Sequence, residues 1–430
     1  MNSESRLSPS RSKVDLMRLA LWLLLAVATA IPGSAQTRPR GRDLGIPFSG
    51  QTGPMNAITD VAGIAVGHVT LIEGEGKLVP GKGPIRTGVT AILPRPRGNW
   101  DPVFAATFNQ NGNGDMTGIN WIKESGFLEG PILLTGTHSV GTVRDAAIQW
   151  QLKNGREFIF TYPIVAETFD FLNDANGEHV KPAHAFEALD RAKPGRVEEG
   201  GVGGGTGMGC NGFKGGIGTA SRVLKASHGG YTVGVLVQCN YGGDLRILGV
   251  PIRPEITDLG TCTVLPPPLS RPWTVGMPQC PASGRGASVD GGGGGSVDGR
   301  AGDHEGRGSI IVIVATDAPL LPHQLERIAR RVSLGMGRLG SFAGNSSGDL
   351  FLAFSTANPG AAKPDGTPSL VMLPNDRIDP LFGATIDATE EAVVNAMLAA
   401  ETMTGADGIR VFGLPGDRVV AAMRKYNRMK

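Results

Sequence analysis

Apolar and polar residues alternate in short blocks along the first half of the chain, and the blocks are of two kinds. Short runs rich in β-branched and aromatic residues, several with partial alternation, predict β-strands. These runs cover residues 64–71, 87–93, 103–108, 131–135, 158–166 and 231–239. Helical patterns lie between them at 139–150 and 182–189. Strands that alternate with helices predict a mixed α/β class.

The last third of the chain continues this pattern. The predicted elements are a strand at 310–314, a helix at 321–332, a strand at 350–355, a helix at 387–404, a strand at 409–412 and a final amphipathic helix. The start of the long helix is set at Asp387, because Glu390 three residues later completes a capping box. Residues 345–349 are small and polar, which predicts a turn before the strand at 350–355.

Residues 266–308 differ in composition from both flanking regions. They contain a run of three prolines and five consecutive glycines, Gly291 to Gly295. Such a stretch buries too little apolar surface to offset the entropy lost on ordering, so we expect disorder. A boundary between two domains is the alternative. Because the part after Ser309 offers three strands only, we favour a single domain over 36–430 with an insert at 266–308.

The N-terminus has the three parts of a secretory signal. Arg11, Lys13 and Arg18 precede an apolar run from Leu19 to Ile31, and small residues lead to a cleavage site after Ala35. A membrane anchor is the alternative reading, but the run is short for a span and ends in proline and glycine. We therefore expect residues 1–35 to be a signal peptide. The mature protein is expected to be periplasmic or secreted and free of the membrane.

Charge and cysteine usage restrict the partners. Lys and Arg number 41 and Asp and Glu 39, and aromatic residues are few, so nucleic acid is not an expected partner. Cys210 and Cys239 lie in core-like segments and are expected to stay buried thiols, whereas Cys262 and Cys280 bracket a proline-rich loop and are expected to pair in an oxidising compartment. No Cys/His spacing indicates zinc, and no cofactor is predicted.

The glycine tract at 200–209 contains one formal nucleotide-binding match. Gly207, Gly209 and Gly212 have the dinucleotide-fingerprint spacing, but the residues that follow, 213–216, do not open a helix. No Lys-Ser/Thr pair completes a phosphate loop either. Nucleotide binding is therefore disfavoured, and close backbone approach with amides directed into a cleft explains the glycines better.

No Gly-x-Ser-x-Gly elbow marks a hydrolase nucleophile. Ser347, in the sequence Ser-Ser-Gly-Asp, is open to two readings, a triad serine or a simple cap. Asn240, after the strand at 231–239, is either an oxyanion donor or a turn former.

Ser309 stands apart because of its neighbours. The peptide bond between two small residues, Gly308 and Ser309, joins the insert to the first residue of an apolar strand. Attack of the Ser309 hydroxyl on the preceding carbonyl would release an α-amine whose ordinary pKa is about 7.7–8.0. Such an amine accepts the hydroxyl proton near neutral pH, so a serine hydrolase needs no triad histidine. A serine that merely starts a strand remains the alternative.

Ten short stretches together resemble the L-aminopeptidase/D-amidase-D-esterase family, which includes the β-aminopeptidases. They run through nearly all of the mature chain except 266–307. The stretches are Arg-Asp-Leu-Gly-Ile-Pro at 42–47, Asn-Ala-Ile-Thr-Asp-Val at 56–61, Gly67-His68, Gly-Thr-His-Ser-Val-Gly at 136–141, Ala-Glu-Thr at 166–168, Leu-Asn-Asp at 172–174, Gly-Gly-Gly-Thr-Gly at 203–207, Gly308-Ser309, Ala-Thr-Asp-Ala-Pro-Leu at 315–320 and Ser-Ser-Gly-Asp at 346–349.

The resemblance implies a four-layer αββα sandwich that is similar to N-terminal-nucleophile hydrolases but connected differently. It implies a precursor that cleaves itself before Ser309 into an α subunit, 36–308, and a β subunit, 309–430, which assemble into homo-oligomers. In this family's pattern Ser309 is the nucleophile, Asn240 an oxyanion donor and Ser347, backed by Asp349, a tuner of the nucleophile. Glu167 would bind the free amino group of the substrate.

Three departures from the family pattern concern substrate range and processing rate. Phe169 stands where some relatives have a tyrosine whose hydroxyl assists the oxyanion. Asp349 stands where some relatives have glutamate, which reaches farther. The insert at 266–308 is longer than the usual linker before the cleaved bond.

The expected activity is hydrolysis of N-terminal amino-acid amides, esters and short peptides, as in an L-aminopeptidase, a D-amidase/D-esterase or a β-aminopeptidase. Two alternatives stay open at this point. Ornithine acetyltransferases also cleave themselves and transfer acyl groups, but they use threonine and are cytoplasmic. An exported, non-catalytic binding protein is the other alternative.

Overall fold

The computed structural model describes residues 38–282, 284–288 and 308–430. Residues Pro39–Lys430 form one compact unit. The signal peptide expected at residues 1–35 lies outside the described residues and stays a prediction. In the described part of the chain, no helix is long and apolar enough to cross a membrane.

The smaller of the two main sheets has four strands in the order β1-β2-β5-β6. Its strands are β1 Ala65–Glu73, β2 Ile85–Leu93, β5 Ile132–Gly136 and β6 Ile164–Thr168. β1, β2 and β5 pair antiparallel in turn, whereas β5 and β6 are parallel. The run at 158–166 was predicted to be one strand, and this is wrong for residues 158–163, which form no strand and leave Ile159 fully exposed.

The larger sheet has six strands in the order β4-β3-β15-β14-β10-β9. They are β3 Val103–Gly112, β4 Phe127–Leu128, β9 Gly216–Val223, β10 Thr232–Tyr241, β14 Gly308–Thr316 and β15 Ser347–Ser355. β14 lies at the centre, antiparallel to β10 and parallel to β15. Its run of Ile and Val is buried on both sides, which explains the absence of polar alternation.

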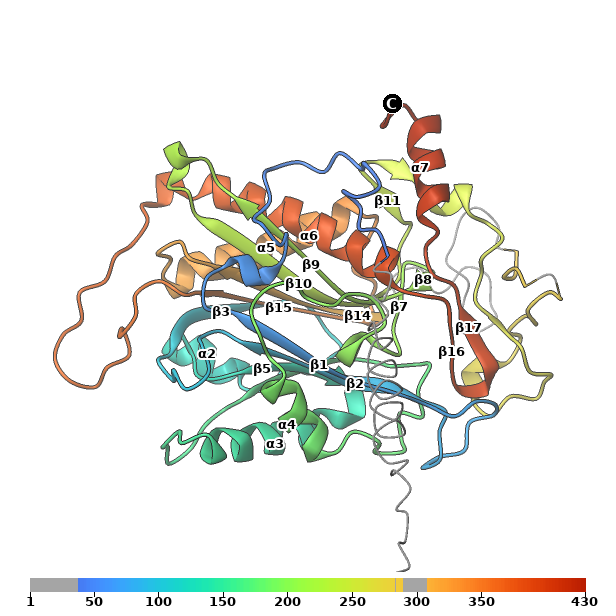
Figure 1. Ribbon diagram of the computed structural model, residues 1–430, viewed down its shortest axis with the longest axis horizontal. Coiled ribbons are helices and arrows are strands. Elements are labelled where there is room, and N and C mark those ends of the chain that lie inside the picture. The colour runs from blue at the N-terminus through green and yellow to red at the C-terminus, as the bar shows by residue number, and fades with distance from the viewer. Residues whose placement is uncertain (1–37, 283, 289–307) are drawn as a thin grey trace, which may run out of the picture. The chain divides into compact units, whose positions relative to one another are not determined.

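Helices cover the outer face of each main sheet (Figure 1). The helices are α3 Val140–Lys153 and α4 Pro182–Asp190 on the four-stranded sheet, and α5 Pro322–Arg338 and α6 Asp379–Ala399 on the six-stranded sheet. A third apolar cluster fills the space between the two sheets, with Leu134 and Ala166 from one sheet and Ile311 and Ile313 from the other. The layers are therefore helix, sheet, sheet, helix, as the αββα prediction requires.

The long helix begins at Asp379 rather than at Asp387, so the predicted capping box is wrong. Asp387 and Glu390 instead form ion pairs with Arg338 on α5, at 2.6 and 3.2 Å. The three-residue spacing of Asp387 and Glu390, which resembles a capping box, therefore serves two tertiary ion pairs with Arg338.

Shorter elements extend the body beside the main sheets. They are α2 Ile119–Ser125, β7 Gly209–Cys210, β8 Phe213–Lys214, β11 Arg246–Ile247, β12 Val250–Pro251, β13 Cys262–Thr263, β16 Met403–Thr404, β17 Ile409–Val411 and α7 Gly416–Lys425. β13, β17 and β16 form a small sheet at one side of the molecule (Figure 1).

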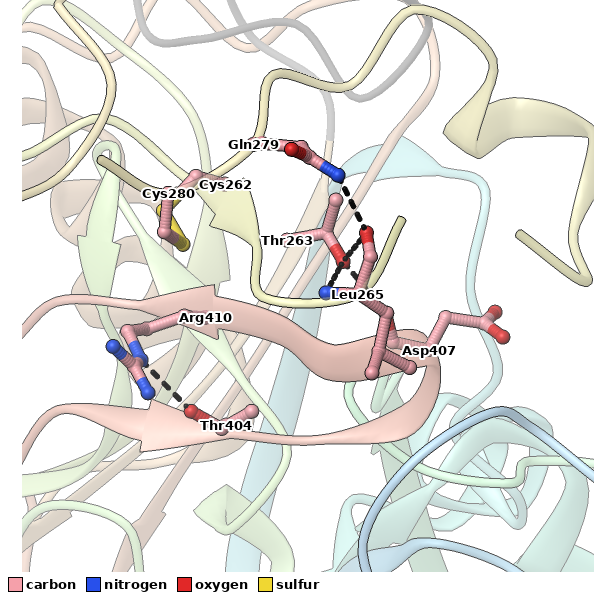
Figure 2. The surroundings of a disulfide bond; sticks show 8 residues. All are labelled: Cys262, Thr263, Leu265, Gln279, Cys280, Thr404, Asp407 and Arg410. Atoms are coloured by element: carbon pink, nitrogen blue, oxygen red, sulfur yellow. Dashed lines mark hydrogen bonds between the residues drawn. A yellow bond between two sulfur atoms is a disulfide. The ribbon is translucent and has the colours of Figure 1, made fainter. Parts of the chain in front are cut away.

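The first part of the insert packs on this small sheet. A disulfide joins Cys262 to Cys280, as the sequence predicts, and the Thr263 hydroxyl donates to the Asp407 carbonyl at 2.8 Å (Figure 2). The Arg271 guanidinium donates to the Asp407 carboxylate at 3.0 Å. Disorder throughout 266–308 is therefore wrong for residues 266–282 and 284–288, because backbone pairing and buried charge replace the missing apolar surface. Residues 289–307 lie outside the described part of the chain.

Candidate active site

Ser309 lies near the start of β14, between Asn240 on β10 and Gly348 on β15. Its side chain is 6 % exposed. Because side chains alternate along a strand, Ser309 shares the face of Ile311 and Ile313, which points toward the other sheet. Asn240, in register with Ser309, shares this face. The central strand therefore presents a buried hydroxyl and a carboxamide side by side at one end of the sandwich.

Gly308 precedes Ser309 in a conformation that only glycine tolerates. Its φ is +126°, and a Cβ at this position would lie 2.0 Å from the Asn240 carbonyl oxygen. The Ser309 hydroxyl donates to the Gly308 carbonyl oxygen at 2.8 Å. The nucleophile predicted from the sequence therefore lies against the carbonyl group of the bond predicted to break.

The carboxamide of Asn240 is held at both of its polar atoms. Its Oδ1 accepts a hydrogen bond from the Gly209 N–H at 2.9 Å, and its Nδ2 donates to the Phe169 carbonyl at 3.0 Å. An amide nitrogen carries two hydrogens, so one donor of Nδ2 is left for a ligand. The second reading of Asn240, as a turn former, is wrong because the residue lies within β10.

Ser347 and Asp349 belong to β15, so the predicted turn at 345–349 is wrong for these two residues. The Ser347 hydroxyl donates to Asp349 Oδ1 at 2.6 Å. In the parallel ladder Ser347 is in register with Gly308, and Asp349 with Ile310. Both polar side chains are fully buried, and this burial raises the pKa of Asp349 while the bond from Ser347 opposes the rise. The pair thus lies beside the Gly308–Ser309 bond.

Glu167 comes from the other sheet, at the end of β6, and is 4 % exposed. Its Oε1 accepts the Asp115 N–H at 2.9 Å, and its Oε2 accepts the Thr137 hydroxyl. Burial raises the pKa of Glu167, and these hydrogen bonds oppose the rise. A Cβ built on Gly114 would lie 3.2 Å from Glu167 Oε1 and 3.3 Å from the Gly348 Cα. Gly114 therefore lies between the Glu167 carboxylate and Gly348, the residue in register with Ser309.

Phe169 follows β6 and is 40 % exposed. Its backbone carbonyl orients Asn240, but its ring carries no hydroxyl that donates to an oxyanion. The structure thus brings together all seven residues that the sequence singled out for the site. Six are buried or half-buried at neighbouring strand ends, and Phe169 lies at the rim.

Four contacts of the site were not predicted. Thr137 holds Glu167, Asp115 holds it by its backbone, Gly114 leaves room between the two sheets, and Gly209 orients Asn240. Thr137 lies in a stretch that carried the family resemblance, and this was the available signal for it. Gly209 belongs to the glycine tract whose amides the sequence predicted to point into a cleft, although Asn240 was not predicted as their partner. Asp115 and Gly114 act through backbone or through lack of a side chain, which leaves no signature in side-chain chemistry.

Cys210 and Cys239 form a disulfide, with their Cα atoms 5.7 Å apart. The prediction that they remain free thiols is therefore wrong. The two residues lie 29 positions apart in the sequence and become neighbours only because β7 folds back on the end of β10. Across the described residues, no group of three or more His, Cys, Asp or Glu side chains is arranged to hold a metal ion.

A buried serine at the head of a central strand, with a held carboxamide beside it and a carboxylate across an αββα sandwich, defines a hydrolase of the N-terminal-nucleophile type. The model of peptidase family S58 matches residues 56–411. The chain belongs to this family and is a serine aminopeptidase.

Relatives of known name support this assignment over the whole chain. The chain is 47 % identical over 411 residues to the β-peptidyl aminopeptidase BapA of Sphingosinicella microcystinivorans, covering 95 % of this chain and 96 % of the relative. The structure of the L-aminopeptidase D-Ala-esterase/amidase of Ochrobactrum anthropi, described as a variant of the Ntn hydrolase fold, is 41 % identical, with a TM-score of 0.77 and coverage of 91 % and 100 %. A Burkholderia sp. β-aminopeptidase is 43 % identical, with a TM-score of 0.73 and coverage of 90 % and 99 %. The predicted family and fold class are confirmed.

Proposed function

We propose that this aminopeptidase cleaves its own Gly308–Ser309 bond and then hydrolyses amides, esters and short peptides that carry a free N-terminal amino group, through an acyl-enzyme on Ser309. The observation that carries the proposal is the position of the Ser309 hydroxyl, 2.8 Å from the Gly308 carbonyl oxygen and in register with Asn240. This is the arrangement that both reactions need, an attacking oxygen beside a carbonyl and an amide donor.

Self-cleavage proceeds in two steps. Ser309 Oγ attacks the Gly308 carbonyl carbon, the hydroxyl proton passes to the amide nitrogen, the C–N bond breaks, and the acyl group moves from nitrogen to oxygen as an ester. Water then hydrolyses the ester, which frees the carboxylate of Gly308, the hydroxyl of Ser309 and its α-amine. The amine then supplies a general base beside the hydroxyl.

Substrate hydrolysis uses the same atoms. Glu167 binds the substrate ammonium by charge-assisted hydrogen bonds, and the α-amine of Ser309 takes the hydroxyl proton as Oγ attacks the carbonyl carbon. The free Nδ2 donor of Asn240 stabilises the oxyanion. Because the Ser347 proton is engaged with Asp349, the Ser347 oxygen is left to accept a hydrogen bond from the amine and hold it in place.

The substrate range follows the names of the relatives. Two of them are named for β-peptidyl or β-amino substrates, and a third for L-amino acids and D-Ala esters and amides. We extend this range to the present chain. Phe169 lacks the hydroxyl of the tyrosine that some relatives have at this position, and this feature separates the chain from them.

We place the mature enzyme in the periplasm or outside the cell. The secretory signal at 1–35 and the two disulfides support this location, because disulfides persist in oxidising compartments. We also propose a homo-oligomer of cleaved units. Exposed apolar side chains on two loops, at 159–162 and 370–372, support it, since exposed apolar patches mark association surfaces.

The intact masses of the purified protein and of Ser309→Ala test the proposal. Wild type should give two chains, the smaller beginning at Ser309, and should hydrolyse an amino-acid p-nitroanilide without an added acceptor. Ser309→Ala should stay one chain and be inactive. An intact, active wild-type chain would refute self-processing, and dependence on an acceptor amine would favour the acyltransferase alternative. Cleavage that persists in Ser309→Ala would assign processing to another protease.

A further inference from the structure

Three consecutive residues of the β7–β8 hairpin, which spans residues 209–214, contact the end of strand β10. The Gly209 N–H donates to Asn240 Oδ1 at 2.9 Å. Cys210 forms the disulfide with Cys239. The Asn211 N–H donates to the Tyr241 carbonyl at 2.7 Å. The covalent bond lies between the two hydrogen bonds.

Two other contacts hold this end of β10: the Phe169 carbonyl accepts a hydrogen bond from Asn240 Nδ2 at 3.0 Å, and Tyr241 is buried in the core. The ladder from β9 stops at the Cys239–Gly216 pair, so Asn240 and Tyr241 extend beyond it. On the opposite side they pair with Ser309 and Gly308 of β14. Cleavage of the Gly308–Ser309 bond ends β14 at Ser309, and Tyr241 then has no covalently continuous neighbour on that side. The hairpin then supports the strand end that carries Asn240, together with the Asn240–Ser309 pair and the Phe169 carbonyl.

The second strand of the hairpin is packed into the interior by Phe213 and Lys214, both fully buried, whereas its first strand, Gly209–Cys210, carries one buried side chain, that of Cys210. The hairpin follows the glycine tract, and glycine gives its backbone wide conformational freedom. Both cysteines are buried in the core between the six-stranded sheet and helices α5 and α6. The disulfide therefore ties the first strand of the hairpin to β10 one residue away from the N–H that orients Asn240.

We propose that the Cys210–Cys239 disulfide is a positioning element for Asn240. It keeps the Gly209 N–H on Asn240 Oδ1, so that the free Nδ2 donor points to the place where the oxyanion develops. The inference rests on the oxyanion role given to Asn240 in the proposed function. Oxyanion donors act through preorganisation, and a donor that is loosely held stabilises the transition state less. The sulfurs take no part in the reaction.

Two variants test the role. Cys210→Ala/Cys239→Ala removes the bond, and Cys210→Ala/Cys239→Val removes it while restoring buried volume. Cys262→Ala/Cys280→Ala, which removes the other disulfide, is the matched control. Each protein is checked by mass for chain cleavage and thiol content, and by thermal melting for folding. kcat and KM are then measured with an amino-acid p-nitroanilide.

We expect both Cys210/Cys239 variants to fold and cleave, with kcat about tenfold lower and KM within about twofold of wild type, since removal of a whole oxyanion donor costs about 10²–10³. The control should keep the wild-type kcat. In an Asn240→Ala background, removal of the Cys210–Cys239 bond should lower kcat no further, because the group that the bond positions is already gone.

The opposite results overturn the inference. They are an unchanged kcat in the volume-restored variant, an equal loss in the control, a further loss in the Asn240→Ala background, free thiols at Cys210 and Cys239 in active wild type, or failure of both variants to fold. Inactive wild-type protein would instead refute the proposed function. This result comes from the wild-type measurement alone, so it is distinct from failure of the inference about the disulfide.

Discussion

Replacement of Glu167 by Gln gives the most direct test of how the substrate is held. The substitution keeps the size of the side chain and removes its charge. Gln still accepts a hydrogen bond from the Asp115 N–H or from the Thr137 hydroxyl, the two groups that hold the carboxylate. The site therefore keeps its shape, and what is lost is attraction between the carboxylate and the substrate ammonium.

The expected size of the effect follows from the burial of Glu167. At 4 % exposure the carboxylate has little solvent screening, so its bond to an ammonium is of the charged kind, worth about 1.5–3 kcal/mol. At about 1.4 kcal/mol per factor of ten, Glu167→Gln should lower kcat/KM by about 10- to 150-fold. Most of the loss should appear as a higher KM, because the ammonium is bound before and during the reaction.

The assay compares kcat/KM for an amino-acid p-nitroanilide in wild type, Glu167→Gln and Glu198→Gln. Glu198 is exposed and lies outside the site, so its substitution controls for net charge. Chain cleavage must be complete in all three proteins. A kcat/KM for Glu167→Gln within twofold of wild type would refute the reasoning, since the amino group would then be bound elsewhere.

The pH profile adds an independent readout. Burial raises the pKa of Glu167 above the ordinary 4.5, and only the charged form attracts an ammonium. Protonation of the Ser309 α-amine lowers kcat/KM in every variant as the pH drops below about 8. kcat/KM should fall further as the pH drops through the raised pKa of Glu167, and Glu167→Gln should lack this second fall while it keeps the first. Asp170, which interacts electrostatically with Glu167, also titrates, so the same profile in Asp170→Asn separates the two carboxyls.

Two further predictions concern single residues of the site region. Asn240→Ala should lower kcat by about 10²–10³ with a small change in KM, measured on the cleaved enzyme; a loss below about fivefold would remove Asn240 from the oxyanion site. Burial raises the pKa of Asp170 from 3.8 to about 7, so its proton stabilises the folded state, and stability should fall as the pH rises from about 4 to 7. The fall corresponds to about 4 kcal/mol, and melting temperatures at pH 4.5 and 7.5 should show it in wild type but not in Asp170→Asn. Equal pH dependence in both proteins would contradict this.

The sequence was sufficient for the parts of the fold that are encoded by apolar runs. β14 and β10 are buried on both faces, so their β-branched runs predicted both strands, with Ser309 at the start of one and Asn240 at the end of the other. β9 was missed because Gly216 and Gly218 interrupt its pattern. A Cβ at Gly218 would lie 2.0 Å from the Ala392 carbonyl oxygen, so Gly218 allows close packing of α6 on the sheet, and a Cβ at Gly216 would lie 1.9 Å from the Gly200 carbonyl oxygen.

Other differences arise where tertiary contacts override local rules. Ser347 and Asp349 look like turn residues, but they occupy a central strand, where the buried Ser347 hydroxyl donates to Asp349 Oδ1. Asp387 and Glu390 imitate a cap because both face Arg338. The Cys210–Cys239 pairing depends on a hairpin with no periodic signal of its own. For Asp387, Glu390 and the two cysteines the deciding partner lies far away in the sequence, whereas Ser347 and Asp349 are neighbours on one strand.

The conformation of Gly308 has a genetic consequence. No side chain fits at this position, so every missense change in its codon is expected to damage the precursor at the bond that must break. Mutation at the residue before the cut therefore offers no gradual way to make maturation faster or slower. Natural or engineered variation in maturation rate has to arise at other codons, and a library for tuning it should leave codon 308 fixed.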